Sequence, residues 1–228
     1  MTAHPAPHQT AGSFAFRKAV RTRYNFLLFQ PHGRAPKSGW PLILFLHGAG
    51  ERGSRLSAVT KHGIPKVAPQ IEGFPFLCVS PQCQAGETWQ VEALLGLLDH
   101  VIKKHRVDPR RVYLTGMSMG GYGTWSLAAA QPKRFAAVSP ICGGGDVVSV
   151  LLADAPRLRV LKTLPIWAFH GGKDEVVPVS ESERMVDAFR KIGNSPKLTI
   201  YPNLAHDCWT GTYENGELYS WLLSHRRK

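Results

Sequence analysis

Residues 112–121 have the sequence VYLTGMSMGG, in which an apolar run passes through a glycine-flanked serine into small residues. The apolar run predicts a buried strand, and the small residues predict a helix over 119–131. A serine with a glycine two places to either side suits a tight strand-to-helix turn, because only small neighbours let the strand and helix approach closely. Such a turn would hold the Ser118 hydroxyl above the sheet and aim the amide N–H of Met119 at the same point. We therefore predict a nucleophile at Ser118 and an oxyanion donor at Met119.

Around this turn, short apolar strands alternate with helices. Strands are expected over 23–30, 41–46, 76–80, 111–115, 135–141, 165–169 and 198–201, and helices over 89–105, 119–131, 180–191 and 215–225. The alternation predicts an α/β fold with a mostly parallel central sheet and helices on both faces. Ligands of such sheets bind at the carboxyl ends of the strands, so the loops that follow the strands should carry the chemistry.

A serine nucleophile needs a histidine as base and an acid that orients this histidine. Asp174 follows the expected strand 165–169, and His206 follows the expected strand 198–201. Both residues therefore fall in strand-end loops on the serine's side of the sheet. The chain order serine, acid, histidine is the one that this fold class uses. We predict a catalytic triad of Ser118, Asp174 and His206.

The second oxyanion donor should come from the loop after an early strand. The loop 47–53 has the sequence HGAGERG, and its glycines leave the backbone free to aim N–H groups inward. We predict the N–H of Ala49 as this donor, with Gly50 as the next choice, and expect His47 to brace the loop by hydrogen bonds. Substrate contacts are considered at five residues near these loops, although the aromatic ones equally suit a core: Gly50, Gln82, Trp89, Tyr122 and Trp209.

The composition excludes several classes of protein. With 43% hydrophobic residues among 228, the chain is not intrinsically disordered. The longest purely apolar run, 42–46, is far short of the roughly 18 residues that a membrane span needs. The formal net charge is +12, but the basic residues are scattered and not interleaved with aromatic ones. We expect a basic solvated surface and no nucleic-acid partner, with polyanion binding as the alternative.

The cysteines and histidines do not form a metal-binding pattern. No CxxC or Cys/His zinc spacing occurs, and no histidine pair is spaced i, i+4 beside a carboxylate. We therefore expect neither a metal nor another cofactor. Cys83 and Cys208 both follow strand-like segments, so a disulfide between them is one alternative, although free thiols are favoured.

We expect one catalytic domain over 23–228, preceded over 1–22 by a flexible leader with a possible first strand. Residues 1–13 lack the hydrophobic region of a signal peptide, which predicts a cytoplasmic protein. The interval 145–164 has room for about one helix, so no cap domain is expected. The partner should be a small-molecule ester, and the protein a monomer or homodimer.

Four segments carry a family resemblance: LHGAGERG (46–53), TGMSMGGYGTW (115–125), WAFHGGKDEVVP (167–178) and AHDCW (205–209). They resemble the α/β-hydrolase-fold serine esterases, and within these the compact carboxylesterase and dienelactone-hydrolase-like branch. That branch is related to feruloyl esterases, polyhydroxybutyrate depolymerases and the catalytic domain of prolyl oligopeptidases. The resemblance runs from about residue 24 to residue 223. It implies triad roles for Ser118, Asp174 and His206 and oxyanion roles for Met119 and Ala49.

One position departs from that branch: dienelactone hydrolase has a cysteine nucleophile where this chain has Ser118. The serine favours plain ester hydrolysis, so a serine carboxylesterase acting on short-acyl or aryl esters is the leading hypothesis. The alternative is a peptidase or thioesterase, such as an acyl-protein thioesterase or lysophospholipase, with the same triad. A hypothesis of a different class is a catalytically silent binding module with a basic surface.

Overall fold

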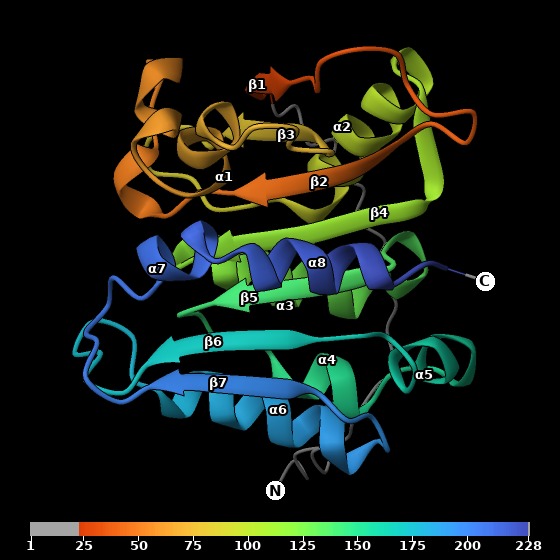
Figure 1. Cartoon of the computed structure of the whole chain (residues 1–228). Coiled ribbons are helices and arrows are strands. Elements are labelled where there is room, and N and C mark those ends of the chain that lie inside the picture. The colour runs from red at the N-terminus through yellow and green to blue at the C-terminus, as the bar shows by residue number, and fades with distance from the viewer. Residues whose placement is uncertain (1–22, 228) are drawn as a thin grey trace, which may run out of the picture.

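The structure, a computed structural model, describes residues 23–227. These residues form a seven-stranded sheet in the order β1-β3-β2-β4-β5-β6-β7, covered by helices on both faces (Figure 1). β1 pairs antiparallel with β3, and all the other strand pairs are parallel. The predicted fold class is thereby confirmed. The strands are β1 (Asn25–Phe29), β2 (Trp40–Leu46), β3 (Leu77–Gln82), β4 (Val107–Met117), β5 (Ala137–Ile141), β6 (Trp167–Gly171) and β7 (Lys197–Tyr201).

The helices divide between two hydrophobic cores, one on each face of the sheet. One face carries α2 (Val91–Lys104), α3 (Met119–Ala130), α4 (Val147–Leu151), α5 (Ala155–Leu161) and α6 (Ser180–Lys191). The other carries α1 (Gly63–Val67), α7 (Trp209–Glu214) and α8 (Gly216–Ser224), which lie in front of the strands in Figure 1. Short 3₁₀ helices complete the chain: η1 (Ala49–Glu51), η2 (Leu56–Lys61), η3 (Ala68–Gln70) and η4 (Pro132–Arg134). None of the helices within residues 23–227 has both the length and the apolar character needed to cross a membrane.

The β2 strand shows why the central strands are continuous apolar runs. Side chains alternate between the two faces of a strand. Leu42, Leu44 and Leu46 therefore enter one core, whereas Ile43 and Phe45 enter the other, and all five are fully buried. A strand covered on both faces needs apolar side chains at every position, so the usual alternation of apolar and polar residues is absent.

Several predicted elements differ from the structure, and α1 and α7 were not predicted. β3 was expected to stop before Pro81 but continues to Gln82, because β1 pairs with it through both positions. β4 begins at Val107, four residues before the expected start, with a register shift against β2. The interval 145–164 holds α4 and α5 in place of a single helix. Asp146 and Asp154 accept hydrogen bonds from the first turns of these helices, and the two short helices leave the strand ends without a cap domain in the described part of the chain.

All four cysteines are buried free thiols. Cys208 lies beside Cys142, and burial raises the pKa of the Cys142 thiol. Cys83 lies directly after β3, where its backbone N–H donates to His47 Nε2 at 2.9 Å. A disulfide between Cys83 and Cys208 is therefore not formed, and the favoured prediction of free thiols is confirmed. The leader expected over 1–22 lies outside the described residues.

Asp108 is a buried carboxylate that fastens the start of β4. Its Oδ2 accepts a hydrogen bond from Arg111 Nε, and its Oδ1 accepts one from the N–H of Arg110, both at 3.0 Å. Burial by itself would raise the pKa of Asp108, but these bonds and the two arginine charges outweigh it and lower the pKa below 3.8. A carboxyl whose pKa is lower in the folded state stabilises the protein above its unfolded pKa, and this contribution is lost as the pH falls.

We expect Asp108→Asn to lower the free energy of unfolding by about 2 kcal/mol at pH 7, because one of its bonds to a charged partner is lost. The difference from wild type should start to shrink below about pH 4, the pKa of an aspartate in the unfolded chain, and should vanish only below the lower pKa of the folded carboxyl. Urea unfolding of both proteins at pH 7 and at about pH 3 measures this difference. Asp99→Asn is the matched control, because Asp99 pairs with Arg134 at an exposed position, where ion pairs contribute little. Equal losses in the two variants would contradict the prediction.

Candidate active site

Ser118, His206 and Asp174 meet at the carboxyl edge of the sheet, in the loops that follow β4, β7 and β6. His206 Nε2 lies 2.9 Å from Ser118 Oγ, and His206 Nδ1 lies 2.7 Å from Asp174 Oδ2. An ionised carboxylate only accepts hydrogen bonds, so Nδ1 must carry the proton. Nε2 then has its lone pair free for the Ser118 hydroxyl. The structure thus brings together the three residues that the sequence predicted for the triad, in an arrangement suited to proton transfer from the serine.

The turn that presents Ser118 is held by close backbone packing. Ser118 has φ 55° and ψ −119°, a conformation that a residue with a side chain rarely adopts. Its N–H donates to Ile141 O of β5, and its carbonyl accepts from the N–H of Tyr122. A Cβ added to Gly120 would lie 1.9 Å from Leu46 O, and one added to Gly116 would lie 2.4 Å from Gly120 O. Glycine is required at both positions because backbone occupies the space that a side chain would fill.

We expect Gly120→Ala to destabilise the protein by about 3 kcal/mol or more and to abolish hydrolysis, because the new methyl group must push α3 away from β2. Gly96→Ala is the control on α2, where a Cβ meets nothing within 4 Å. That variant should gain about 1 kcal/mol from helix propensity. Thermal unfolding of both variants measures the contrast, and a Gly120→Ala protein as stable as wild type would contradict it.

Asp174 is held by backbone groups on one side and imidazoles on the other. Its Oδ1 accepts hydrogen bonds from the N–H groups of Val176 and Val177, both at 2.9 Å. Its Oδ2 faces His206 and also lies 3.3 Å from His170 Nε2. Burial alone would raise the pKa of Asp174, but the hydrogen bonds from His206, Val177 and Val176 lower it. The carboxyl is therefore ionised at neutral pH and keeps the His206 ring in the orientation that faces Ser118.

His170 does not compete with His206 for the role of base. Its Nδ1 lies 2.7 Å from Ser182 Oγ, and its Nε2 lies 2.9 Å from Val177 O. The side chain is fully buried behind Asp174. Both ring nitrogens are thus engaged at the loop that holds Asp174.

The loop after β2 packs against Ser118 and leads into η1. A Cβ added to Gly48 would lie 3.6 Å from Ser118 Cβ, so Gly48 packs directly on the serine. His47 braces the loop: its Nε2 accepts the N–H of Cys83, its Nδ1 donates to Gly48 O, and its carbonyl accepts from Trp89 Nε1. Burial lowers the pKa of His47 to about 4, so this ring is neutral and both nitrogens are engaged. Ala49 follows as the first residue of η1, as Met119 is the first of α3.

The other residues considered as substrate contacts have different positions. Gln82 is 2% exposed, and its amide donates to Glu51 O and Arg55 O, so the expectation of substrate contact is not supported there. Gly50 is exposed on η1 beside Ala49. Trp209 stands edge-on against the His206 ring, with centroids 5.1 Å apart, and packs on the base.

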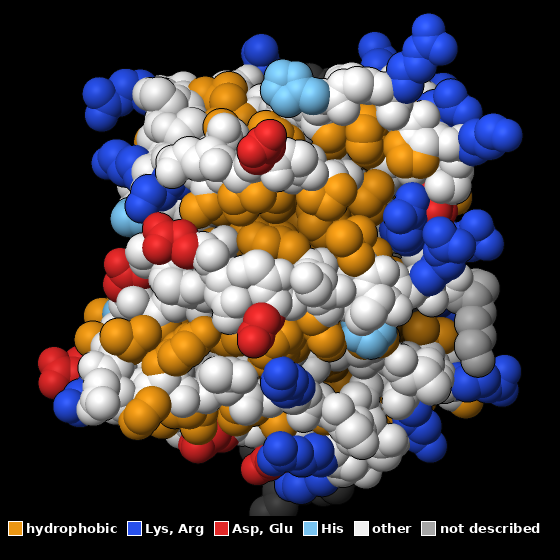
Figure 2. Space-filling model, in the orientation of Figure 1, with side chains coloured by type: hydrophobic (Ala, Val, Ile, Leu, Met, Phe, Trp, Pro, Cys, Tyr) orange, Lys and Arg blue, Asp and Glu red, His pale blue; other side chains and the backbone are white. Residues whose placement is uncertain are grey.

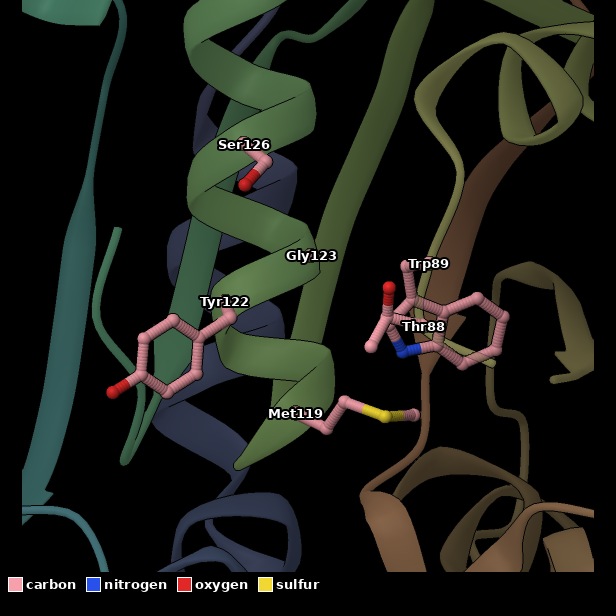
Figure 3. A pocket seen from close by; sticks show the side chains of 6 residues that line it. All are labelled: Thr88, Trp89, Met119, Tyr122, Gly123 and Ser126. Atoms are coloured by element: carbon pink, nitrogen blue, oxygen red, sulfur yellow. The ribbon is translucent and has the colours of Figure 1, made fainter. Parts of the chain in front are cut away.

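A cavity of about 460 Å³ lies along the outer surface of α3 and is lined by Met119, the residue that follows Ser118. Figure 3 shows the Met119 side chain extending toward Trp89 on one side, while Tyr122 points to the other side. These three residues include two of the predicted contacts, Trp89 and Tyr122. Sequence analysis missed the rest of the lining. The helical spacing from Met119 along α3 could have indicated Gly123 and Ser126. The missed residues are Thr88, Gly123 and Ser126.

Glu51 is a buried acid beneath the same loop that sequence analysis did not place. Its side chain is 8% exposed, and its Oε1 lies 4.0 Å from His62 Nε2. Within residues 23–227, its Oε2 has no hydrogen-bond partner and would lie 3.3 Å from a Cβ added to Gly48. The described part of the chain has no group of three His, Cys, Asp or Glu that could hold a metal ion.

The chain is similar to several known esterases. The model of the phospholipase/carboxylesterase family matches residues 74–215, which include Ser118, Asp174 and His206. A bifunctional acetylxylan esterase/xylanase from Neocallimastix patriciarum is 28% identical over 205 residues, covering 85% of this chain and 27% of that enzyme.

Two solved structures show the same fold. A thermostable esterase has a TM-score of 0.78 and 32% identity, covering 89% of this chain and 59% of that one. Acyl-protein thioesterase 2 from Zea mays has a TM-score of 0.62 at 17% identity, covering 88% of this chain and 98% of that one, and shows likeness of fold alone. This chain thus spans less than two thirds of the length of both the acetylxylan esterase/xylanase and the thermostable esterase.

Proposed function

Because the chain belongs to the phospholipase/carboxylesterase family, we propose that it is a serine carboxylesterase that hydrolyses short-acyl or aryl esters. The observation that carries the proposal is the hydrogen-bonded array of Ser118, His206 and Asp174 at the carboxyl edge of the sheet. Residues 23–228 would serve as one catalytic domain.

In the proposed cycle, Ser118 Oγ attacks the ester carbonyl while His206 Nε2 takes the hydroxyl proton. The negative charge that develops on the carbonyl oxygen is stabilised by the N–H groups of Met119 and Ala49. Each of these residues begins a helix, where the first N–H groups have no acceptor within the helix. His206 then gives its proton to the leaving alcohol, and an acyl-enzyme forms on Ser118. Water, deprotonated by the same histidine, releases the acid and restores the serine.

The ionised Asp174 supports both proton transfers. When His206 takes a proton, the ring becomes a cation next to the buried carboxylate, which stabilises that cation. The two N–H groups on Oδ1 and the 2.7 Å contact on Oδ2 fix the carboxylate, so no reorganisation is needed during the reaction.

The substrate class follows from the open surroundings of Ser118. No cap covers the strand ends in the described residues, and the neighbouring cavity of about 460 Å³ is lined by aromatic and thioether side chains. An aryl or short acyl group is small enough for this cavity, against Trp89 and Met119, whereas a long chain would extend into water. The similarity to an acetylxylan esterase/xylanase supports a short acyl group, because an acetyl group has only two carbons.

Hydrolysis of p-nitrophenyl acetate, butyrate, octanoate and palmitate tests the proposal. We expect kcat/KM to be highest for the two shorter esters and to fall for the longest, because the cavity offers no enclosed tunnel for the chain. A fluorophosphonate probe should label Ser118 in the same preparation. Labelling without ester turnover would replace the ester with a peptide or thioester as substrate. No labelling and no turnover would refute a serine hydrolase.

A further inference from the structure

A second cavity, of about 640 Å³, lies at the edge of the sheet opposite Ser118. It opens where β5 and β6 begin, between α5 and the segment that follows α8. The two ends of a five-residue strand such as β5 are about 15 Å apart, so this cavity is separate from the site around Ser118. Its lining comprises Pro132, Lys133, Phe135, Ala136, Arg159, Val160, Thr163, Leu164, Pro165, His225, Arg226 and Arg227.

The floor of this cavity is apolar. Phe135, Ala136 and Leu164 are buried and belong to the layers beside the sheet, and Val160 adds a half-buried aliphatic side chain from α5. A floor of this kind favours a ligand with an apolar body, because binding then removes apolar surface of both the ligand and the cavity from water. The volume falls within the roughly 300–1,000 Å³ of small-molecule sites.

The rim is cationic, and no carboxylate lines it. Arg226 is partly neutralised by Asp108, 3.5 Å away, and Arg227 donates to Lys133 O and Pro109 O. Lys133 and Arg159, by contrast, have no acidic partner among residues 23–227. Figure 2 shows Lys and Arg side chains gathered toward the side where the C-terminal end lies. The side chains of Lys133 and Arg159 therefore place two positive charges without acidic partners at the rim, above the apolar floor.

Residues 225–227, which follow α8, form one wall of the cavity. Hydrogen bonds hold this wall in place, and it carries a polar atom without a partner. His225 O accepts a hydrogen bond from Tyr113 OH, and the N–H of Arg227 donates to Arg110 O, both at 2.9 Å. The His225 ring stands edge-on against Trp221, with centroids 4.8 Å apart. Its Nε2 is buried and has no partner within the described chain. A buried polar atom without a partner is costly, and a ligand or water in the cavity would satisfy it.

We infer that this cavity binds an amphiphilic anion, a carboxylate on a medium-length apolar chain. The carboxylate lies against Lys133 and Arg159, and the chain lies on Phe135, Val160 and Leu164. Both parts of the ligand are needed, because the cations select the charge and the floor selects the chain.

Isothermal titration with octanoate, acetate and octyltrimethylammonium tests this inference on the full chain. Octanoate should bind, whereas acetate lacks the apolar chain and octyltrimethylammonium has the wrong charge. The double variant Lys133→Glu/Arg159→Glu should bind octanoate at least about tenfold more weakly, because two charge-assisted contacts are lost. The control Arg55→Glu/Lys61→Glu makes the same change of charge at η2, which packs on β3 and on η1 at the edge of the sheet that carries Ser118. This control should bind octanoate like wild type.

Hydrolysis of p-nitrophenyl acetate by the same proteins separates this site from the active site. Neither Lys133 nor Arg159 lies near Ser118, so turnover should be unchanged in the double variant while octanoate binding is lost. Octanoate binding that is equal in both double variants would overturn the inference, because the ligand would then occupy another place. Acetate binding as strong as that of octanoate would overturn it too, because the apolar floor would contribute nothing.

Discussion

Replacing Ser118 with alanine is expected to lower kcat for p-nitrophenyl acetate by a factor on the order of 10⁶, with the fold unchanged. In the proposed cycle the hydroxyl oxygen forms the bond of the acyl-enzyme, and without it the remaining groups would only bind and polarise the ester. Alanine retains the Cβ that already occupies the φ 55° conformation, so the turn is no more strained than in wild type. Residual turnover should come from the oxyanion N–H groups alone.

Ser220→Ala is the matched control for this variant. Ser220 is exposed on α8, where its hydroxyl donates only to Gly216 O. Its loss should leave kcat within about twofold of wild type, since surface substitutions of this kind have small effects. Circular dichroism and thermal unfolding of both proteins show whether the fold is retained. A Ser118→Ala protein that is folded and still turns over the ester at the wild-type rate would exclude Ser118 as the nucleophile.

Replacing Asp174 with asparagine is expected to lower kcat by a factor on the order of 10⁴. The N–H groups of Val176 and Val177 both donate to Oδ1 and therefore select the amide oxygen of the asparagine at this position. The amide NH₂ must then face His206 Nδ1. A donor there forces Nδ1 to accept, so the ring proton moves to Nε2, which points at Ser118. The histidine would be held in the tautomer that is unable to take the serine proton.

Asp207→Asn is the control that makes the same chemical change next to His206. The Asp207 side chain accepts hydrogen bonds from the N–H and the hydroxyl of Thr210 at the start of α7, and asparagine caps a helix nearly as well. We expect kcat of this variant to stay within about threefold of wild type. If Asp174→Asn and Asp207→Asn lost activity to the same extent, the tautomer argument would be wrong, and the loop rather than the carboxylate would govern the rate.

Most of the architecture was predictable from local patterns. The run Leu42 to Leu46 is apolar at every position because both of its faces are buried, and this marked a central strand. The glycines around Ser118 marked the turn because backbone fills the space beside them. The boundaries that were missed depend on partners elsewhere in the chain. β3 continues through Pro81 only because β1 lies alongside it.

The candidate site divides in the same way. Ser118, Asp174 and His206 could be named because each follows a strand, and parallel strands place their carboxyl ends at one edge. Gln82, the last residue of β3, lies at the same edge, yet its amide donates to Glu51 O and Arg55 O. The sequence therefore predicts which residues lie at the carboxyl edge of the sheet. Whether such a side chain is free to contact a substrate or is bonded to a neighbouring loop depends on the tertiary structure.

The sequence by itself determined the order of the strands and of the longer helices along the chain, the serine turn, and the candidate residues Ser118, Asp174 and His206. It could do so because periodicity and glycine spacing act over a few neighbouring residues. Only the tertiary structure decided which groups meet. It placed Cys208 beside Cys142 and joined Asp108 to Arg226, more than a hundred residues away in the chain. It also gathered Lys133 and Arg159 over one apolar floor. Such encounters depend on how the strands are ordered across the sheet and how the helices cover it, and no local pattern specifies that packing.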